Sequence, residues 1–253
     1  MTPALRVRRL SSETNTARWH PELIIFDVDG VLVDVRGSYH RTTLQTVRFF
    51  TGRRVTLHQL QEWKNRSGFN DDWALSTAWV QALGGRFGYE EVKRKFVELY
   101  WGTDGPGNVR REKWLLPVRT LTRLSERAEL AIFTGRTRKE LDHTLELRGV
   151  RKFFRDIVTV EDVARPKPHP EGLTNILKGR EPGKAIYVGD SVDDAIASRA
   201  AKMPFIGVLF GRGEARRQRA HLLKKQGAIA VINNVTDLEA WIARSPCGAK
   251  PRS

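Results

Sequence analysis

The chain has 253 residues, 40% of them apolar, which is enough for one large domain or for a core domain with a smaller companion. Its single cysteine, Cys247, excludes an internal disulfide framework, and no run of about 20 apolar residues indicates a membrane span, so we expect a cytoplasmic protein without a membrane partner. The 44 basic residues outnumber the 29 acidic ones and give a net charge of +15, which favours anionic partners such as phosphate esters or nucleic acid.

Both ends of the chain have the composition of flexible segments. Residues 1–20 are rich in Arg, Ser and Thr and lack the apolar stretch of a secretory signal. Their composition faintly resembles an organellar presequence, but we favour a simple basic extension. Residues 244–253, rich in Ser, Pro and Gly, are expected to form a C-terminal tail.

The first predicted strand, Leu23–Asp27 in "PELIIFDVDGVLVD", runs into two carboxylates. Asp27 and Asp29 are separated by one residue, so along an extended chain both side chains point to one side. Two like charges that close require a cation between them or a shared proton. A strand end followed by an Asp-Gly turn would also produce this pattern.

A helical stretch interrupts the chain after the first strand. Residues 37–114 contain helical patterns and almost no strand signal. Ser38 and Gly52 mark the ends of one predicted helix, and Asp71 or Asp72 caps another. We interpret this stretch as an all-helical insertion.

Short apolar runs alternate with helical patterns in the rest of the chain. The runs expected to form strands are Leu130–Phe133, Ile157–Val160, Ala185–Val188, Phe205–Leu209 and Ile229–Ile232. The helical patterns cover approximately residues 118–127, 138–148, 170–179, 192–201 and 214–226. This alternation predicts an α/β fold with a doubly wound parallel sheet, formed by residues 21–36 and 115–243.

Polar clusters follow several of the predicted strands. The strand that ends at Phe133 leads into Thr134, Gly135 and Arg136, and the strand that ends at Val188 leads into "GDSVDD". A loop between them, "RPKPHP", carries Lys167. Because ligands of an open parallel sheet bind beyond the carboxyl ends of its strands, these clusters are expected to meet the opening aspartates in one site.

This combination resembles the haloacid dehalogenase-like hydrolase superfamily, most of whose members are phosphatases. The positions that match its four motifs are Asp27-x-Asp29-Gly30-Val31, Thr134, Lys167 and Gly189-Asp190-x-x-x-Asp194. The resemblance extends from about residue 22 to about residue 242. It implies a Rossmann-like core, with the helical insertion as a cap of the type found in phosphoglycolate phosphatases and β-phosphoglucomutases.

The resemblance also implies chemical roles for the aspartates. Asp27 would attack the substrate and form an aspartyl-phosphate, and Asp29 would act as general acid and then as general base. Mg²⁺, a hard cation, would bind the Asp27 carboxylate, the Asp29 carbonyl oxygen and Asp190, with Asp194 in support. The second aspartate distinguishes the chain from dehalogenases and phosphonate-cleaving members, and indicates a phosphate ester as substrate.

The remaining motif residues would bind the phosphoryl group. The resemblance implies that the Thr134 hydroxyl and the Lys167 ammonium contact its oxygens. Backbone amides around Gly30 and at Gly135 would complete the anion site.

We therefore expect a Mg²⁺-dependent phosphatase that acts on a small phosphorylated metabolite resembling phosphoglycolate or a sugar phosphate. A phosphomutase is the alternative, because "DVDGVLVD" resembles β-phosphoglucomutases, although His40 lies one residue from the position of their histidine. Arg136 either contacts a second anionic group or pairs with a core acid. The candidates for substrate selection are Arg36, His40, Lys64, Arg66, Asn70, Trp73 and Arg136.

A basic segment lies late in the core. Residues 211–227 concentrate six cations within a predicted helix: Arg212, Arg216, Arg217, Arg219, Lys224 and Lys225. Contact with nucleic-acid phosphates would explain them, as in a nucleic-acid-binding or end-processing protein. No aromatic residues interleave them, so base stacking is not indicated. We favour a solvated helix face, with Ala215, Leu222 and Leu223 packed inward. The sequence leaves a monomer and a homodimer equally open.

Overall fold

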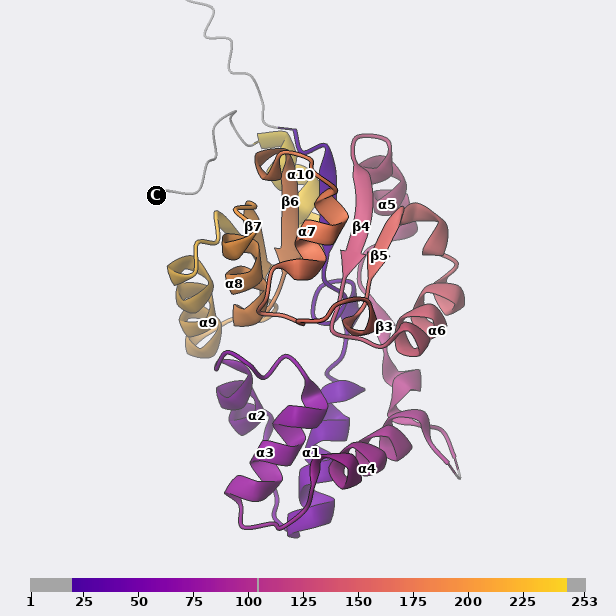
Figure 1. Ribbon diagram of the computed structural model, residues 1–253, viewed down its shortest axis with the longest axis vertical. Helices are drawn as coiled ribbons and strands as arrows, with labels where there is room; N and C mark the ends of the chain where they lie inside the picture. Colours follow the sequence, from indigo (N-terminus) through magenta and orange to yellow (C-terminus); the bar gives the residue numbers. More distant parts are fainter. Residues whose placement is uncertain (1–19, 104, 245–253) are drawn as a thin grey trace, which may run out of the picture.

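The computed structural model describes residues 20–103 and 105–244. Figure 1 shows an α/β core at the top of the view and a separate group of helices below it. Nearly all of the predicted terminal segments, 1–20 and 244–253, lies outside the described residues. Within the described ranges, no helix combines the length and apolar character that crossing a bilayer requires.

Six parallel strands form the central sheet, in the order β5-β4-β1-β6-β7-β8. Their bounds are β1 (Leu23–Phe26), β4 (Glu129–Phe133), β5 (Asp156–Val158), β6 (Ala185–Gly189), β7 (Phe205–Val208) and β8 (Ala230–Ile232). The first strand of the chain lies in the middle of the sheet, where Ile25 pairs with Ala131 on one side and Tyr187 on the other. All four residues of β1 are buried, so the carboxylates that follow emerge at the centre of the sheet edge.

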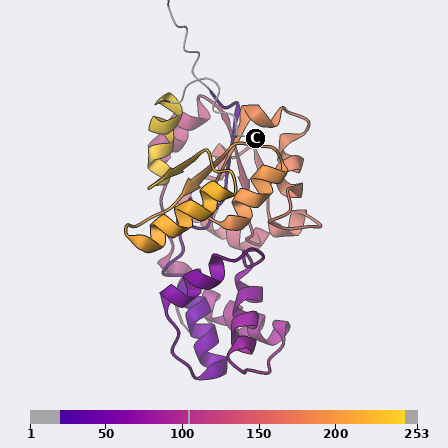
Figure 2. The same cartoon turned by 90° about the vertical axis from the view of Figure 1, so that its left-hand side faces the viewer.

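Helices cover both faces of this sheet, as Figure 2 shows. The alternation of β1 divides the apolar core: Ile24 and Phe26 pack with one set of helices, and Leu23 and Ile25 with the other. The first set is α5 (Val118–Ser125), α6 (Arg138–Arg148) and α10 (Leu238–Arg244), and the second is α7 (Glu171–Leu177), α8 (Val192–Ala200) and α9 (Glu214–Lys225). The predicted doubly wound parallel sheet is confirmed.

The insertion forms a helical cap with its own core. Its helices are α1 (Tyr39–Thr51), α2 (Leu57–Lys64), α3 (Asp72–Ala82) and α4 (Tyr89–Trp101). The residues at the centre of this small core are Val47, Leu60, Leu75, Trp79 and Val80. The α1 helix ends at Gly52 in a left-handed conformation, and Asp71 caps α3 through the Trp73 amide. Ser38 occupies the N-cap position of α1, but its side chain makes no capping hydrogen bond.

The chain passes between core and cap through two adjacent linkers. Two short strands, β2 (Val33–Asp34) and β3 (Lys113–Trp114), pair antiparallel there. These two strands are not predictable from the sequence, because two residues are too few to show an alternation of apolar and polar side chains. The short 3₁₀ helices are η1 (Asn108–Arg111), η2 (Arg151–Phe153), η3 (Val160–Asp162), η4 (Pro182–Lys184) and η5 (Val235–Asp237). The predicted strand at Ile157–Val160 therefore ends early, and Val160 begins η3.

Candidate active site

Asp27 stands at the end of the central strand. Its amide donates to the Val188 carbonyl at 2.8 Å, which continues the pairing of β1 with β6 by one residue. The next carbonyl, of Val28, accepts hydrogen bonds from the amides of residues 31, 32 and 33, and so turns the chain sharply. The side chain of Asp27 is almost completely buried. A carboxylate is thereby held at a fixed point of the sheet edge.

Gly30 allows two strand ends to approach each other. It has a φ of +74°, which favours glycine, and a Cβ atom at this position would lie 2.3 Å from Asp190 Oδ2. The loop after β1 and the loop after β6 therefore pack closer than any side chain on residue 30 would permit. This contact places Asp190 beside the opening aspartates.

Lys167 joins the nucleophile candidate to the last motif. Its Nζ lies 2.8 Å from both Asp27 Oδ1 and Asp194 Oδ1. Burial opposes the charged ammonium, but Asp194 and Asp27 outweigh it and raise the pKa of Lys167 above its ordinary value. Thr134, also buried, accepts the Arg136 amide at 3.1 Å.

Asp194 has every lone pair engaged. One oxygen accepts from Lys167 and from the Tyr187 hydroxyl at 2.7 Å; the other accepts the Ser191 hydroxyl at 2.7 Å and two backbone amides. Burial works against ionisation, yet Lys167 and these hydrogen bonds lower the pKa of Asp194. Ser191 in turn caps α8. Asp194 is therefore a fixed negative charge that organises its neighbours.

Three carboxylates converge at this edge. Oxygens of Asp27, Asp190 and Asp194 all lie within 4.8 Å of one another. Burial, reinforced by the neighbouring carboxylates against the opposing charge of Lys167, raises the pKa of Asp27 well above its usual range. Burial also raises the pKa of Asp190 to about 6, although Arg219 opposes the shift. A divalent cation with oxygen preference would relieve this repulsion, so the donor set fits Mg²⁺.

Asp29 is tied to a buried arginine. Arg136 Nη2 lies 2.6 Å from Asp29 Oδ1 and 2.8 Å from Glu112 Oε1, and the guanidinium is completely buried. Thr144 accepts a further hydrogen bond at 2.8 Å, and the Tyr39 ring packs 5.2 Å from the guanidinium carbon. Of the two alternatives for Arg136, the structure therefore has the pairing with core acids.

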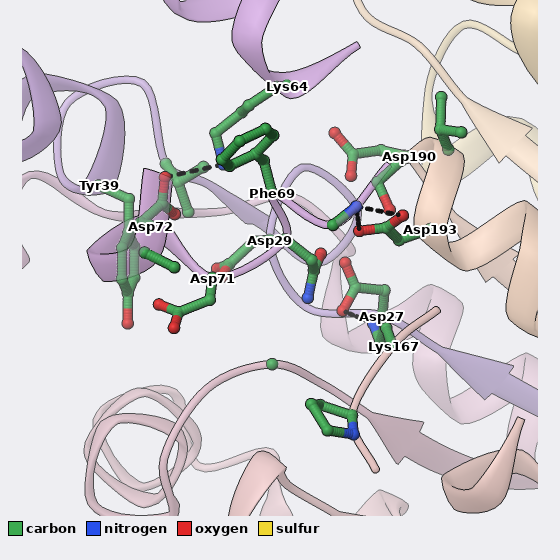
Figure 3. Close-up of a pocket in the computed structure, with 18 of the residues that line it drawn as sticks. Asp27, Asp29, Tyr39, Lys64, Phe69, Asp71, Asp72, Lys167, Asp190 and Asp193 are labelled. Atoms are coloured by element: carbon green, nitrogen blue, oxygen red, sulfur yellow. Dashed lines mark hydrogen bonds and ion pairs between the residues drawn. The ribbon is translucent and has the colours of Figure 1, made fainter. Parts of the chain in front are cut away.

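A cavity of about 390 Å³ separates these groups from the cap (Figure 3). Five of the seven substrate-selection candidates line it: His40, Lys64, Asn70, Trp73 and Arg136. The other two do not. Arg36 pairs with Asp34 at 2.6 Å and faces a different hollow, and Arg66 stacks over the Trp63 ring at 4.7 Å.

The cap side of the cavity is itself rich in charge. Lys64 Nζ lies 2.9 Å from Asp72 Oδ1, a pair visible in Figure 3. Burial, together with the positive charges of Lys64 and Arg219, lowers the pKa of His40 to about 3. His40 therefore lines the cavity as a neutral, polar imidazole at physiological pH.

The cap also contacts the core directly. The Ser67 hydroxyl donates to Asp193 Oδ1 at 2.7 Å, and the Gly68 amide donates to both oxygens of the same carboxylate. A Cβ atom on Gly135 would lie 2.6 Å from the Asn70 amide nitrogen, so cap and core almost touch there as well. These contacts hold the loop between α2 and α3 over the cavity.

Several residues of the site were not predicted from the sequence, although the spacing of one of them on its helix indicated its position. Arg219 donates to the Asp190 carbonyl at 3.1 Å and lies 3.3 Å from its carboxylate, although we had counted it in a solvated helix face. It precedes Leu222 and Leu223 by three and four residues, so it shares their side of α9. Ala215, which we expected to pack inward, is exposed. Glu112 and Tyr39 carried no comparable signal.

Comparisons with known proteins agree with this geometry. Residues 118–208 match the model of a family described as haloacid dehalogenase-like hydrolase. The chain is 34% identical over 197 residues to an imidazoleglycerol-phosphate dehydratase of Phytophthora nicotianae, covering 74% of this chain and 43% of that protein. It is 24% identical to phosphoglycolate phosphatase 1 of Pseudomonas aeruginosa, covering 86% and 78%.

A solved structure extends the likeness to the cap. A haloacid dehalogenase-like protein of Agrobacterium tumefaciens superposes with a TM-score of 0.68 at 24% identity, covering 88% of this chain and 97% of that one. At this identity the likeness shows the fold. The chain spans less than half the length of the Phytophthora relative, so that protein's activity does not transfer directly.

Proposed function

We propose that the chain is a Mg²⁺-dependent phosphatase of small phosphorylated metabolites within the haloacid dehalogenase-like hydrolase family, whose model matches residues 118–208. The observation that carries this proposal is the buried Asp27 carboxylate at the end of the central strand, with Lys167 Nζ at 2.8 Å and the Asp29 side chain beside it. A nucleophile, a fixed cation and a candidate proton donor are thus gathered at one edge of the sheet.

The reaction would proceed in two steps on this chain's own residues. A carboxylate oxygen of Asp27 attacks phosphorus in line, the bond to the leaving oxygen breaks, and Asp29 gives that oxygen a proton. Asp29 then removes a proton from water, which attacks the aspartyl-phosphate and frees Asp27 and inorganic phosphate. Lys167 and the Thr134 hydroxyl neutralise charge on the phosphoryl oxygens in both steps.

The cofactor proposal rests on the acidic cluster. Mg²⁺ would be held by the carboxylates of Asp27 and Asp190 and by the Asp29 carbonyl, with Asp194 orienting its surroundings. When bound, it supplies positive charge beside the phosphoryl oxygens. Arg136 is a positioning residue in this proposal, since it holds the Asp29 carboxylate at 2.6 Å without lying at the nucleophile.

The charges of the cavity favour a neutral leaving group. Each of its four lysines and arginines lies within 3.3 Å of a carboxylate oxygen, in the pairs Lys64–Asp72, Arg136–Asp29, Lys167–Asp27 and Arg219–Asp190. Among the described residues that line the cavity, every lysine and arginine already has a carboxylate partner, so a carboxylate on the leaving group, as in phosphoglycolate, would have to compete for it. Three side-chain amides, of Gln61, Asn65 and Asn70, also line the cavity and suit hydroxyl groups. A sugar or polyol phosphate therefore fits better than phosphoglycolate.

The experiment that tests this function is phosphate release from a panel of esters with and without Mg²⁺. The panel includes phosphoglycolate and imidazoleglycerol phosphate, after the names of the relatives, together with hexose and polyol phosphates. We expect turnover that stops with excess EDTA, is inhibited by Ca²⁺, and is fastest on neutral hydroxylated leaving groups. Undiminished turnover in EDTA would contradict the metal assignment, and a preference for phosphoglycolate would contradict the charge argument.

A phosphomutase is the second candidate, because the opening motif resembles that of β-phosphoglucomutases and the cap lies close over the site. A mutase must shield the aspartyl-phosphate until a sugar hydroxyl accepts the phosphoryl group. Incubation with β-glucose 1-phosphate and a trace of glucose 1,6-bisphosphate separates the two. We expect free phosphate as the main product; glucose 6-phosphate forming faster would establish the mutase instead.

A further inference from the structure

A second hollow, of about 470 Å³, lies where the cap joins the core. Five arginines line it: Arg36, Arg41, Arg48, Arg54 and Arg111. They come from four segments, namely the linker before α1, α1 itself, the α1–α2 loop and the end of η1. Among the described residues that line it, none is acidic and none also lines the active-site cavity. The hollow is therefore a separate, strongly positive site.

Most of this charge has no acidic partner among the described residues. Arg36 pairs with Asp34 at 2.6 Å. Across the described ranges 20–103 and 105–244, no ion pair joins any of the other four to an acid. Like charges gathered around one concavity repel each other, and a bound anion removes that repulsion. This distribution of positive charge suits an anionic ligand that carries several negative charges.

The hollow also has an apolar wall. Leu44, Val55 and Leu57 line it, and Leu57 is 53% exposed. Arg41, Leu44 and Arg48 follow one another at spacings of three and four, so guanidinium and apolar groups share one face of α1. Of the residues of α1 outside this face, Tyr39 packs against Arg136 of the core and Val47 is buried in the apolar core of the cap. A ligand here meets both charge and apolar surface.

We propose that this hollow binds a nucleoside di- or triphosphate. The planar guanidinium forks suit phosphate oxygens, which they bind in bidentate fashion, and the apolar wall suits the base. The volume lies in the range of small-molecule sites, about 300–1,000 Å³. A nucleic-acid strand would instead call for an extended groove with stacking aromatics, and no aromatic residue lines the hollow.

The hollow lies between the two linkers and the first helix of the cap. Arg36 and Arg111 belong to the two linkers, which approach so closely that a Cβ atom on Gly37 would lie 3.0 Å from Arg111 Cβ. Arg41 and Arg48 belong to the cap. A nucleotide held by all of them would bridge both linkers and the cap's first helix.

Calorimetric titration of the full chain with ATP, at physiological salt and in EDTA, tests the proposal. We expect saturable binding, with an affinity that Arg41→Ala/Arg48→Ala lowers by about tenfold or more. The reason is that each lost charge-assisted hydrogen bond to a phosphate contributes substantially to the binding free energy. The matched control is Arg212→Ala/Arg217→Ala, with Arg212 just before α9 and Arg217 within it, which removes the same charge from exposed positions and should leave binding unchanged. Lys167→Ala, which alters the active site, should also leave it unchanged. Should the first pair impair folding, Arg54→Ala/Arg111→Ala replaces it.

Four results would overturn the assignment. Equal loss in both double variants would mean nonspecific charge attraction, and loss in Lys167→Ala would place the nucleotide in the active site. Displacement of ATP by a single-stranded oligonucleotide at lower concentration would make the ligand nucleic acid. Absence of binding to the unmodified chain would remove the site altogether. Because catalysis is not measured, these outcomes are independent of the phosphatase proposal.

Discussion

Asp194 and Lys167 of the core are held in a different way from Asp71 of the cap. In the core, Asp194 and Lys167 are fully buried and each meets several fixed partners at 2.7–2.8 Å. In the cap, Asp71 is exposed and bonds to the Trp73 amide and, at 3.4 Å, to the Tyr89 hydroxyl. The core groups are therefore preorganised for one chemistry, whereas the cap presents a wall that different substrates can contact. Substitutions in the core should act on turnover, and those in the cap on substrate binding.

The largest effect is expected from Asp27→Asn. The amide is nearly isosteric but cannot attack phosphorus, so turnover should vanish. Phosphate release under single-turnover conditions measures this, with circular dichroism as the control for folding. Activity near that of the unmodified chain would show that no aspartyl-phosphate forms on Asp27.

Asp29→Asn should lower turnover by about 10²- to 10⁴-fold, the usual contribution of general acid–base catalysis. Turnover of substrates with good leaving groups, such as nitrophenyl phosphate, should fall less than turnover of alkyl esters, because good leaving groups need less proton donation. An equal loss on both types would argue against proton transfer by Asp29 to the leaving group.

Arg136→Ala should reduce stability as well as activity. It leaves Glu112 buried without its ionic partner, and breaking such a pair costs about 3–5 kcal/mol of unfolding free energy. Urea unfolding measures the loss. Arg138→Ala is the control, since it removes an arginine two positions away that is paired at the surface, at 2.6 Å from Asp162; its effect should stay within about 1 kcal/mol.

Ser67→Ala tests the contact between cap and core. It removes the hydrogen bond to Asp193 but leaves the Gly68 amide in place. We therefore expect substrate binding to weaken by about 1 kcal/mol, so that KM rises roughly fivefold while kcat is almost unchanged. Steady-state kinetics on the preferred ester measures the two constants. A drop confined to kcat would mean that this loop acts on the chemistry and not on substrate retention.

The last effect concerns His40 and is confined to acidic solution. Its pKa of about 3 lies below the ordinary value near 6.5, so between these values the unfolded chain takes up a proton that the folded chain does not. Stability should fall as pH falls through this window and be unaffected above it. His40→Asn should make the unfolding free energy less sensitive to pH between about 6.5 and 3. An unchanged slope would show that the imidazole titrates normally.

Features set by neighbouring residues in the chain could be predicted from the sequence, whereas contacts between distant residues could not. The strand ends and the residues after them follow from short apolar runs and from motifs, so the placement of Thr134, Lys167 and Asp190 at one edge could be anticipated. The partners of Arg136 could not, because Glu112 comes from beyond the cap and pairs only after folding. Arg36 and Arg66 were selected by their position near polar loops, yet the structure directs both away from the cavity.

The pairing of β2 with β3 means that the chain leaves the core and returns to it across the width of a hairpin. Topologically, the cap is a large loop of that hairpin, and closing even a long loop adds little entropy cost beyond that of a short one. The apolar cluster on one face of the sheet contains no cap residue, whereas the cluster on the other face also includes Tyr39, Phe96 and Tyr100 of the cap. A different helical unit with equally close ends could occupy the same place in the chain only if it supplied the apolar side chains that α1 and α4 contribute to that second cluster.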